Sequence, residues 1–418
     1  MQFIIEGGKK LNGDIWVSGA KNAALPIIAA TLLTDDECIL DNVPRISDVE
    51  TLLNILKSLG SAVAWTGEHQ VTICNRNATF HNPDYQSVKS LRASILFFGS
   101  FLARFHTIDM IEPGGCIIGN RPLDTHFHAL SKLGVRMEKK NGTYALSSDG
   151  LRGAEVVLLE ASVTATENIL MAAVYAQGVT VIKNAACEPH VQDLVTFLQK
   201  LGADIAGNGT TTLTVHGVSV LHGTVHTIIP DTIEAGTFLM LGIANKGKLR
   251  INNVIPEHMD VVLEKLKMMG AKFDVSDTTI TTHSHGIMRA AKIDARPYPG
   301  IPTDLQSVFG VLATQIQGTT LIWDTLFEGR MGYVQELVRM GANAVICDPH
   351  RVLITGPTPL YGQEIRSFDL RAGAAMIIAG LIASGRTVIN GAEIVSRGYE
   401  RIVERLQAVG ADIQQKDS

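Results

Sequence analysis

The chain has 418 residues, of which 46% are hydrophobic and 18% charged, so it holds enough apolar material for the cores of two or three ordinary domains. This composition excludes a disordered or fibrous protein. The 36 basic and 41 acidic residues are interspersed and give a net charge of -5, which argues against nucleic acid as a partner.

The sequence carries no targeting or membrane signal. The first ten residues contain no basic stretch leading into a long apolar one. The longest apolar runs, such as Ala372 to Ala383, fall well short of the roughly 20 residues that span a bilayer. We therefore expect a cytoplasmic protein without a membrane partner. Its five widely spaced cysteines are expected to be free thiols, because their odd number and spacing fit neither a disulfide framework nor a zinc cluster.

An internal repeat organises the chain. Six similar segments, among them LKSLGS and LQKLGA, end an amphipathic stretch with a glycine. These glycines are Gly60, Gly134, Gly202, Gly270, Gly341 and Gly410. Their successive separations are 74, 68, 68, 71 and 69 residues, which predicts six repeats of about 70 residues, each with an amphipathic helix capped by glycine.

A second helix is predicted earlier in every repeat. These stretches are apolar on nearly every face and begin at Ala23, Ala93, Asn168, Gly236, Ser307 and Ala372. A helix without a polar face belongs inside the fold, with the amphipathic helices and the strands around it. An L-x-G-x-x-[IV] strand is predicted before four of them, at 11–15, 151–156, 221–225 and 360–365. Each repeat is thus predicted to run strand, buried helix, strand, amphipathic helix, strand, strand.

Three repeats make a domain of ordinary size, so the sequence predicts an α/β protein of two pseudo-symmetric domains. We place one domain at residues 21–228 and a discontinuous one at 1–20 with 229–418. The strand at Leu11 to Val17 has no repeat before it and is expected to pair with the C-terminal repeats.

Charged and polar residues stand where the buried helices begin. They are Lys21 with Asn22, Arg92, Ser162 with Thr164, Asp231, Asp304, and Asp369 with Arg371. Taken singly, the Asp and Ser residues could be N-caps and the arginines solvated. A cation at a helix N-terminus opposes the macrodipole, however, and incurs a cost unless an anion offsets it. The set therefore predicts an anion site for a doubly anionic or phosphate-rich substrate.

Cys116 lies in EPGGCIIGNRP, a segment whose glycines (Gly114, Gly115 and Gly119) suggest a mobile lid with a thiol near Arg121. The alternative is that Cys116 is a small buried apolar residue. Two histidine pairs, His126 with His128 and His283 with His285, face one way only on a strand, and no triad of Asp or Glu accompanies either pair, so we expect no metal. Dinucleotide, P-loop and HExxH motifs are absent from the sequence, and we expect no cofactor.

Six motifs occur in order along the chain and carry a family resemblance. They are SGAKNAALP (18–26), LRAS (91–94), PGGCIIGNRP (113–122), YPGIPTDLQ (298–306), DLRAGA (369–374) and RGYERI (397–402). With these motifs the chain resembles, end to end, the UDP-N-acetylglucosamine 1-carboxyvinyltransferase family of enolpyruvyl transferases. The resemblance implies two inside-out α/β domains of three repeats each. It implies transfer of the enolpyruvyl group of phosphoenolpyruvate to the 3-hydroxyl of UDP-N-acetylglucosamine, the committing step of peptidoglycan synthesis.

The resemblance also implies roles for single residues. Lys21 and Asn22 would hold the phosphate of phosphoenolpyruvate and the ligand's neighbouring groups, joined by Arg121 and Arg397. The cationic wall would be completed by Arg92, Arg330 and Arg371. Asp304 would be the base at the sugar hydroxyl, and Asp369 would assist a later proton removal. Cys116 would be the acid that protonates the vinyl carbon, or a group that assists product release, and the thiol that fosfomycin-type epoxides alkylate. The remaining implied substrate-binding residues are Pro122, Leu123, Asp124, Ser162, Val163, Thr164, Leu326 and Glu328.

The sequence departs from the usual family pattern at several positions. Glu160 stands where Lys is common, Thr164 where Gly is usual, and Leu96 where Trp is frequent. The segment Glu328-Gly329-Arg330-Met331 replaces the commoner Glu-Asn-Arg-Phe. Glu160 facing a diphosphate would repel it, so two alternatives stay open: neutral lineage variation, or a silent paralogue that binds a sugar nucleotide. The shikimate-pathway enolpyruvyl transferase shares the six-repeat design but is not expected to carry the cysteine loop.

Overall fold

The computed structural model describes residues 1–80, 85–111, 114, 118–119 and 121–416, except for the side chains of residues 85, 87, 90 and 140. The chain forms two compact units. Unit 1 comprises Met1–Ser18 and Pro230–Ser418, together with Ile118 and Gly119. Unit 2 comprises Gly19–Gly115 and Arg121–Ile229. Each unit has its own hydrophobic core of buried side chains.

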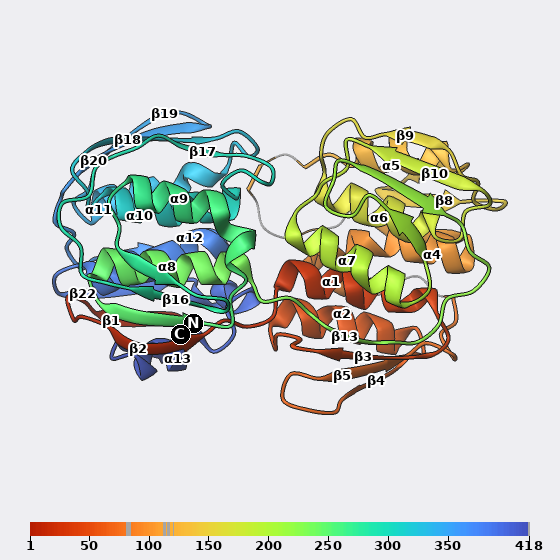
Figure 1. Cartoon of the computed structure of the whole chain (residues 1–418), viewed down its shortest axis with the longest axis horizontal. Coiled ribbons are helices and arrows are strands. Elements are labelled where there is room, and N and C mark those ends of the chain that lie inside the picture. The colour runs from red at the N-terminus through yellow and green to blue at the C-terminus, as the bar shows by residue number, and fades with distance from the viewer. Residues whose placement is uncertain (81–84, 112–113, 115–117, 120, 417–418) are drawn as a thin grey trace. The chain divides into compact units, whose positions relative to one another are not determined.

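Each predicted apolar stretch forms a helix, or a helix with a leading 3-10 turn, inside its unit. They are α1 (Lys21–Ala30), α4 (Phe97–Phe105) and α6 (Val163–Ala173) in unit 2, and α8 (Thr232–Asn245), α10 (Gln306–Ala313) and α12 (Leu370–Ile382) in unit 1. The prediction is confirmed in α12, where Leu370 to Leu381 are all buried. Small residues let these helices meet closely, because a Cβ on Gly99 of α4 would lie 2.3 Å from the Asn168 carbonyl oxygen of α6. Within unit 1, Figure 1 shows α8, α10 and α12 between sheets.

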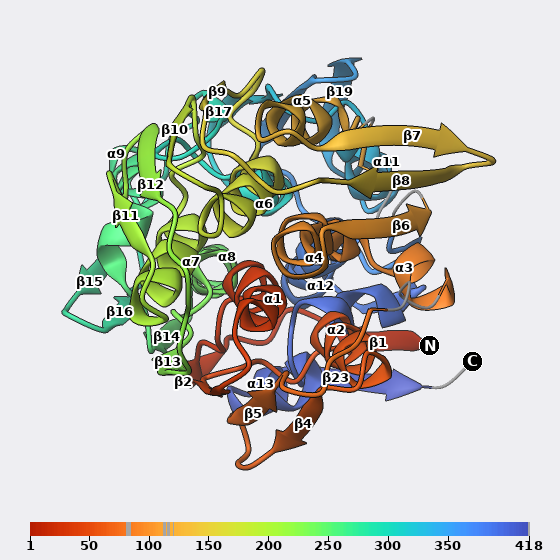
Figure 2. The same cartoon turned by 90° about the vertical axis from the view of Figure 1, so that its right-hand side faces the viewer.

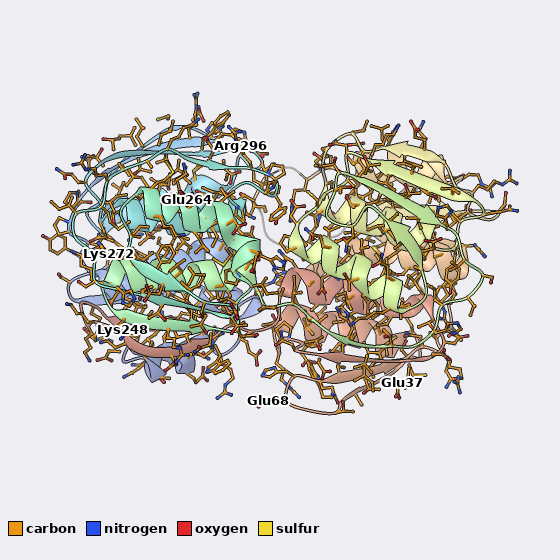
Figure 3. The ribbon with its side chains drawn as sticks, in the orientation of Figure 1. Glu37, Glu68, Lys248, Glu264, Lys272 and Arg296 are labelled. Atoms are coloured by element: carbon orange, nitrogen blue, oxygen red, sulfur yellow. The ribbon has the colours of Figure 1, made fainter. Side chains whose placement is uncertain are left out.

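The amphipathic helices lie nearer the surface of each unit. They are α2 (Ser47–Ser58), α5 (Asp124–Lys132), α7 (Pro189–Lys200), α9 (Asp260–Met268), α11 (Tyr333–Arg339) and α13 (Ile402–Ala408). The glycine after each has a positive φ, between 89° and 106°, which confirms the predicted caps. Charged side chains such as Glu264 and Lys272 point outward from unit 1 (Figure 3). The short helix α3 (Tyr85–Ser90) and six 3-10 turns complete the helical elements: η1 (Thr31–Leu33), η2 (Arg92–Leu96), η3 (Pro256–Met259), η4 (Thr303–Leu305), η5 (Arg330–Gly332) and η6 (Ala392–Arg397).

The strands form small sheets of three or four, three in each unit. In unit 2 the orders are β13-β3-β5-β4, β6-β8-β7 and β11-β12-β10-β9. Their bounds are β3 (Glu37–Asp41), β4 (Ala62–Trp65), β5 (Val71–Cys74), β6 (Thr107–Ile111), β7 (Arg136–Lys140), β8 (Thr143–Ser147), β9 (Glu155–Val157), β10 (Val179–Lys183), β11 (Asp204–Ala206), β12 (Thr212–His216) and β13 (Val225–Thr227).

In unit 1 the orders are β15-β16-β14-β2, β17-β18-β20-β19 and β21-β22-β1-β23. Their bounds are β1 (Gln2–Glu6), β2 (Asn12–Trp16), β14 (Lys248–Asn252), β15 (Phe273–Val275), β16 (Thr279–Thr282), β17 (Ile293–Ala295), β18 (Gly318–Asp324), β19 (Asn343–Asp348), β20 (Arg351–Gly356), β21 (Glu364–Arg366), β22 (Arg386–Asn390) and β23 (Asp412–Lys416).

The second repeat departs from the predicted element order. Its sheet, β6-β8-β7, has three strands, and the described part of this repeat starts with α3 and η2 rather than with a strand. The described residues therefore do not show the predicted leading strand in this repeat. No L-x-G-x-x-[IV] motif precedes this buried helix in the sequence, but the fifth repeat also lacks the motif and still begins with β17, so the absence of the motif does not distinguish the second repeat.

The L-x-G-x-x-[IV] motifs lead into strands rather than forming them along their whole length. At 151–156 only Glu155 and Val156 belong to β9, and at 221–225 only Val225 belongs to β13. Three of the motif glycines lie where another backbone passes, since a Cβ would lie 2.4 Å from the Val179 carbonyl oxygen at Gly153, 2.1 Å from that of Glu37 at Gly223 and 2.2 Å from that of Arg386 at Gly362. Gly13 instead lies within β2 and has a φ of +137°. Steric fit thus explains the first three glycines, and the residues that follow them join the sheet.

The N-terminal strands pair with the C-terminal repeats, as predicted. β2 is parallel to β14, and β1 lies between β22 and β23, antiparallel to both. Figure 2 shows β1 and β23 side by side, with the N-terminus at this sheet. Across the described residues, no helix has the length and apolar character needed to cross a membrane.

Candidate functional site

Asp304, Arg330 and Arg371 form a charged cluster in unit 1. Asp304 lies in η4, immediately before buried α10, and its side chain is 19% exposed. Its Oδ2 accepts a hydrogen bond from Arg371 Nε at 2.9 Å, and its Oδ1 lies 2.8 Å from Arg330 Nη1. Three predicted site residues from three different elements therefore meet at one carboxylate.

The two arginines decide the ionisation of Asp304. Burial alone would raise the pKa of this carboxyl group, but the charges of Arg330 and Arg371 and the hydrogen bonds they donate lower it well below its ordinary value. Asp304 is therefore an anion at any physiological pH. A carboxylate held by two cations is a weak base in this arrangement.

Each of the two guanidinium groups has a buried nitrogen donor that no described residue pairs. Arg330 and Arg371 are 8% and 5% exposed. Among the described residues, Arg330 Nε and Arg371 Nη1 are buried without a hydrogen-bond partner. A buried unpaired donor is costly, so two on neighbouring cations indicate a place for an anion. The Tyr399 ring lies 5.5 Å from the Arg371 guanidinium carbon and adds a cation–π contact.

Two further predicted site residues of unit 1 are Asp369, at the start of α12, and Arg397, at the end of η6. Asp369 is the N-cap of α12, and its Oδ1 accepts hydrogen bonds from the backbone N–H groups of Arg371 and Ala372 at 2.8 and 3.0 Å. The N-cap alternative is thus confirmed for Asp369, as it is for Ser162 and Asp231. Arg397 is half-buried and ends η6.

Asp324 is an organising residue that the sequence analysis missed. It is fully buried at the end of β18, where its Oδ2 accepts a hydrogen bond from Thr303 Oγ1. Its Oδ1 accepts from the N–H groups of Leu326 and Phe327 at 2.9 and 3.1 Å. Asp324 therefore fixes both the turn that carries Asp304 and the loop that carries Leu326 and Glu328. The feature of the sequence that could have identified Asp324 is an acidic residue at the end of a strand.

Gly329, one of the departures from the family pattern, has a steric explanation. Its N–H donates to the Ile118 carbonyl oxygen at 3.0 Å. A Cβ at position 329 would lie 2.7 Å from the Ile118 carbonyl carbon. The neighbouring Glu328 side chain packs against Gly119, where a Cβ would lie 2.5 Å from its Oε2. A residue larger than glycine therefore does not fit at 329 in this arrangement.

In unit 2, Lys21 pairs with an acid inside the protein. Lys21 is the first residue of α1 and Asn22 the second, and both are half-buried. Lys21 Nζ lies 2.5 Å from Asp48 Oδ2 of α2, with the two side chains 13% and 8% exposed. Asp48 therefore supplies a counter-charge inside unit 2 at a helix N-terminus where the sequence analysis expected an external anion. Asp304 does the same for Arg371 in unit 1.

Arg92 and Arg121 are brought together in unit 2. Arg92 opens η2 and donates from Nη2 to the Arg121 carbonyl oxygen at 2.5 Å. The residues after Arg121 lead into α5: Pro122 is exposed, Leu123 is the buried N-cap residue, and Asp124 is the exposed first residue. This places a basic pair beside a helix N-terminus.

Three more of the predicted substrate-binding residues lie at the start of α6. Ser162 caps the helix by accepting from the Ala165 N–H at 3.4 Å, and Val163 and Thr164 form its half-buried first turn. Glu160 is exposed, and its Oε1 accepts from Thr125 Oγ1 of α5 at 3.4 Å. The N-termini of α5 and α6 are therefore linked through Thr125 and Glu160.

Cys116 lies outside the described residues. The other thiols range from buried (Cys38) to exposed (Cys347), and none of the four forms a disulfide. Burial raises the pKa of Cys38 to about 11, so this thiol is inert at neutral pH. In the described part of the chain, no group of three or more His, Cys, Asp or Glu side chains could hold a metal ion.

Comparison with known proteins identifies the family. The model of the EPSP synthase (3-phosphoshikimate 1-carboxyvinyltransferase) family matches residues 5–406. The chain belongs to this family. It is 43% identical over 424 residues to UDP-N-acetylglucosamine 1-carboxyvinyltransferase of Borreliella burgdorferi, covering 100% of this chain and 99% of that protein.

Solved structures share the fold. The enolpyruvyl transferase NikO from Streptomyces tendae superposes with a TM-score of 0.91 at 25% identity, covering 99% of this chain and 98% of that one. EPSP synthase from Acinetobacter baumannii superposes with a TM-score of 0.76 at 20% identity, over 99% and 100% of the two chains. The protein is therefore an enolpyruvyl-transferase-family enzyme with the predicted α/β fold.

Proposed function

We propose that this enzyme transfers the enolpyruvyl group of phosphoenolpyruvate to the 3-hydroxyl of UDP-N-acetylglucosamine and releases phosphate, in the cytoplasm, as the first committed step of peptidoglycan synthesis. The observation that carries the proposal is the Asp304 carboxylate held by two buried arginines with donors to spare. The full-length relative at 43% identity supports this acceptor over 3-phosphoshikimate, since the solved EPSP synthase is only 20% identical.

The proposed reaction has two stages. The 3-hydroxyl oxygen adds to C2 of phosphoenolpyruvate while Cys116 protonates C3, which gives a tetrahedral ketal. Loss of a C3 proton, with Asp369 assisting, and of phosphate from C2 then restores the double bond. A protonated thiol suits the first step because its ordinary pKa is about 8.5. Each proton-transfer residue would contribute roughly 10²–10⁴ in rate.

Asp304 would act as the base for the sugar hydroxyl. When anionic substrate groups engage Arg330 and Arg371, the attraction that lowers the pKa of Asp304 is shared, and the carboxylate becomes more basic. Lys21, Asn22, Arg121 and Arg397 would hold the phosphate that leaves. Arg92, Arg330 and Arg371 would stabilise charge as it develops.

The sugar nucleotide would lie along the N-termini of α5 and α6. The residues assigned to it are Pro122, Leu123, Asp124, Ser162, Val163, Thr164, Leu326 and Glu328. We also propose that the protein has two functional domains of three repeats each, residues 21–228 and residues 1–20 with 229–418. Small molecules are the proposed partners, and neither nucleic acid nor a membrane is required.

The test is phosphate release from phosphoenolpyruvate, measured with and without UDP-N-acetylglucosamine. The proposal expects release only with the sugar nucleotide, and expects it to be lost in Asp304→Ala. Cys116→Ala distinguishes an essential acid from a helper. If the folded wild-type protein releases no phosphate, the silent-paralogue alternative replaces the proposal, with Glu160 and Thr164 as the first residues to revert.

A further inference from the structure

A chain of buried side chains leads from the core of unit 2 to Thr164. It starts at Asn168 of α6, which is 1% exposed. Asn168 Oδ1 accepts from the Gly99 N–H at 2.7 Å, and its Nδ2 donates to the Ile95 carbonyl oxygen at 3.1 Å. A backbone N–H can only donate, so the orientation of the amide is fixed. The Nδ2 group therefore also faces His126 Nδ1, at 3.2 Å.

The amide sets the tautomer of His126. Burial, and secondarily the charge of Arg92, lowers the pKa of His126 to about 3, so its ring is neutral. Nδ1 faces a donor and must accept, which leaves the ring proton on Nε2. Nε2 lies 3.1 Å from Thr164 Oγ1. His126 therefore donates to the Thr164 hydroxyl oxygen.

This contact orients the hydroxyl of Thr164. Thr166, two residues further along α6, donates its hydroxyl hydrogen to the Ser162 carbonyl oxygen at 2.8 Å. Thr164 is half-buried, and within the described residues its hydroxyl hydrogen has no acceptor. Because His126 occupies a lone pair of the oxygen, the O–H is held ready to donate to a ligand.

We propose that Thr164 is a specificity residue that donates a hydrogen bond to a phosphate oxygen of the nucleotide, and that His126 is the positioning residue that orients it. The inference rests on the proposed function, which places the nucleotide at this end of α6. Thr164 supplies a donor close to Glu160, where the family commonly has Lys and this chain an acid.

Calorimetric binding of UDP and of uridine tests the role of Thr164. Thr164→Val should weaken UDP binding by about tenfold, the effect of losing one hydrogen bond to an anion, while uridine binding is unchanged. Thr164→Ser should retain the wild-type affinity for UDP. In the transferase assay, Thr164→Val should raise KM for UDP-N-acetylglucosamine and leave kcat unchanged. The matched control is Thr51→Val on α2, where the hydroxyl donates to the Ser47 carbonyl oxygen.

A double-mutant cycle tests the role of His126. His126→Gln should weaken UDP binding when Thr164 is present and have no further effect in Thr164→Val. Adding Glu160→Lys to Thr164→Val should restore UDP affinity. The inference is overturned if Thr164→Val keeps UDP affinity within twofold, or if UDP and uridine weaken equally. In those cases wild-type phosphate release would leave the proposed function intact, whereas a wild type with neither UDP binding nor release would overturn both.

Discussion

Asp304 and Arg371, 67 residues apart in sequence, are joined by a hydrogen bond of 2.9 Å between Oδ2 and Nε. Arg330 lies against the other oxygen of the same carboxylate. The three groups are largely buried, so each charge depends on the others for its stability. The predicted catalytic carboxylate is therefore also a structural element of unit 1.

Asp304→Asn removes the negative charge and leaves two buried arginines without a counter-charge. We expect a loss of about 3–5 kcal/mol in the free energy of unfolding, measured by urea denaturation, together with loss of phosphate release. Asp348→Asn is the control, because Asp348 pairs with Arg351 on the surface and such pairs contribute about 0–1 kcal/mol. Equal effects of the two substitutions would contradict the burial argument.

Glu167 predicts a pH dependence of stability. Its side chain is buried in α6, and burial, with the charge of Glu188 second, raises its pKa well above the ordinary value. The folded protein keeps this proton, whereas the unfolded chain releases it above about pH 4.3. The stabilisation that the protonated Glu167 carboxyl group gives the fold is therefore complete below about pH 4.3. It is lost as the pH rises toward the folded-state pKa, by about 1.4 kcal/mol per pH unit.

Glu167→Gln should consequently raise the free energy of unfolding more at pH 8 than at pH 5. Urea denaturation at both values measures it, with exposed Glu264→Gln as the control. A stabilisation that does not change with pH would show that Glu167 is ionised in the fold.

Gly202 tests the glycine caps. Its φ of +106° is strained for any other residue, although a Cβ would meet nothing nearer than a ring carbon of His222 at 3.8 Å. Gly202→Ala should therefore lower the free energy of unfolding by about 1 kcal/mol through backbone strain alone. Gly286→Ala is the matched control, since a Cβ there has open space and ordinary φ. If Gly202→Ala is as neutral as the control, the cap is not a determinant of the repeat.

Cys116 should be the thiol that a phosphonate epoxide labels. Mass spectrometry after treatment with fosfomycin is expected to find one adduct, on Cys116, with phosphate release lost in proportion. Exposed Cys347 and half-buried Cys74 are internal controls for thiol reactivity. Labelling of Cys347 at the same rate would show that exposure, rather than the surroundings of Cys116, determines the reaction.

The repeats were readable from the sequence because their signals are local. A capping glycine and an apolar stretch each depend on a few neighbouring residues, and both were confirmed throughout. The three-stranded sheet that the described part of the second repeat forms was not predicted, because one order was extended to all six repeats. All four motif glycines were read as parts of strands, whereas close backbone approach is what requires Gly153, Gly223 and Gly362, and only Gly13 lies within a strand.

The site was only partly readable. Charged residues at helix N-termini identified Asp304, Arg371 and Lys21, but their partners depend on contacts between distant segments. Asp48 lies 27 residues from Lys21, and no periodicity connects the two. Asp324 and His126 act through buried hydrogen bonds, which become visible only once the elements are packed.

The most direct test of the central claim compares acceptors. Phosphoenolpyruvate is incubated with the full-length enzyme and either UDP-N-acetylglucosamine or 3-phosphoshikimate, and phosphate and the enolpyruvyl ether are both measured. We predict phosphate release and a 3-O-enolpyruvyl product with UDP-N-acetylglucosamine alone. Turnover of 3-phosphoshikimate, or phosphate release that needs no acceptor, would contradict the account.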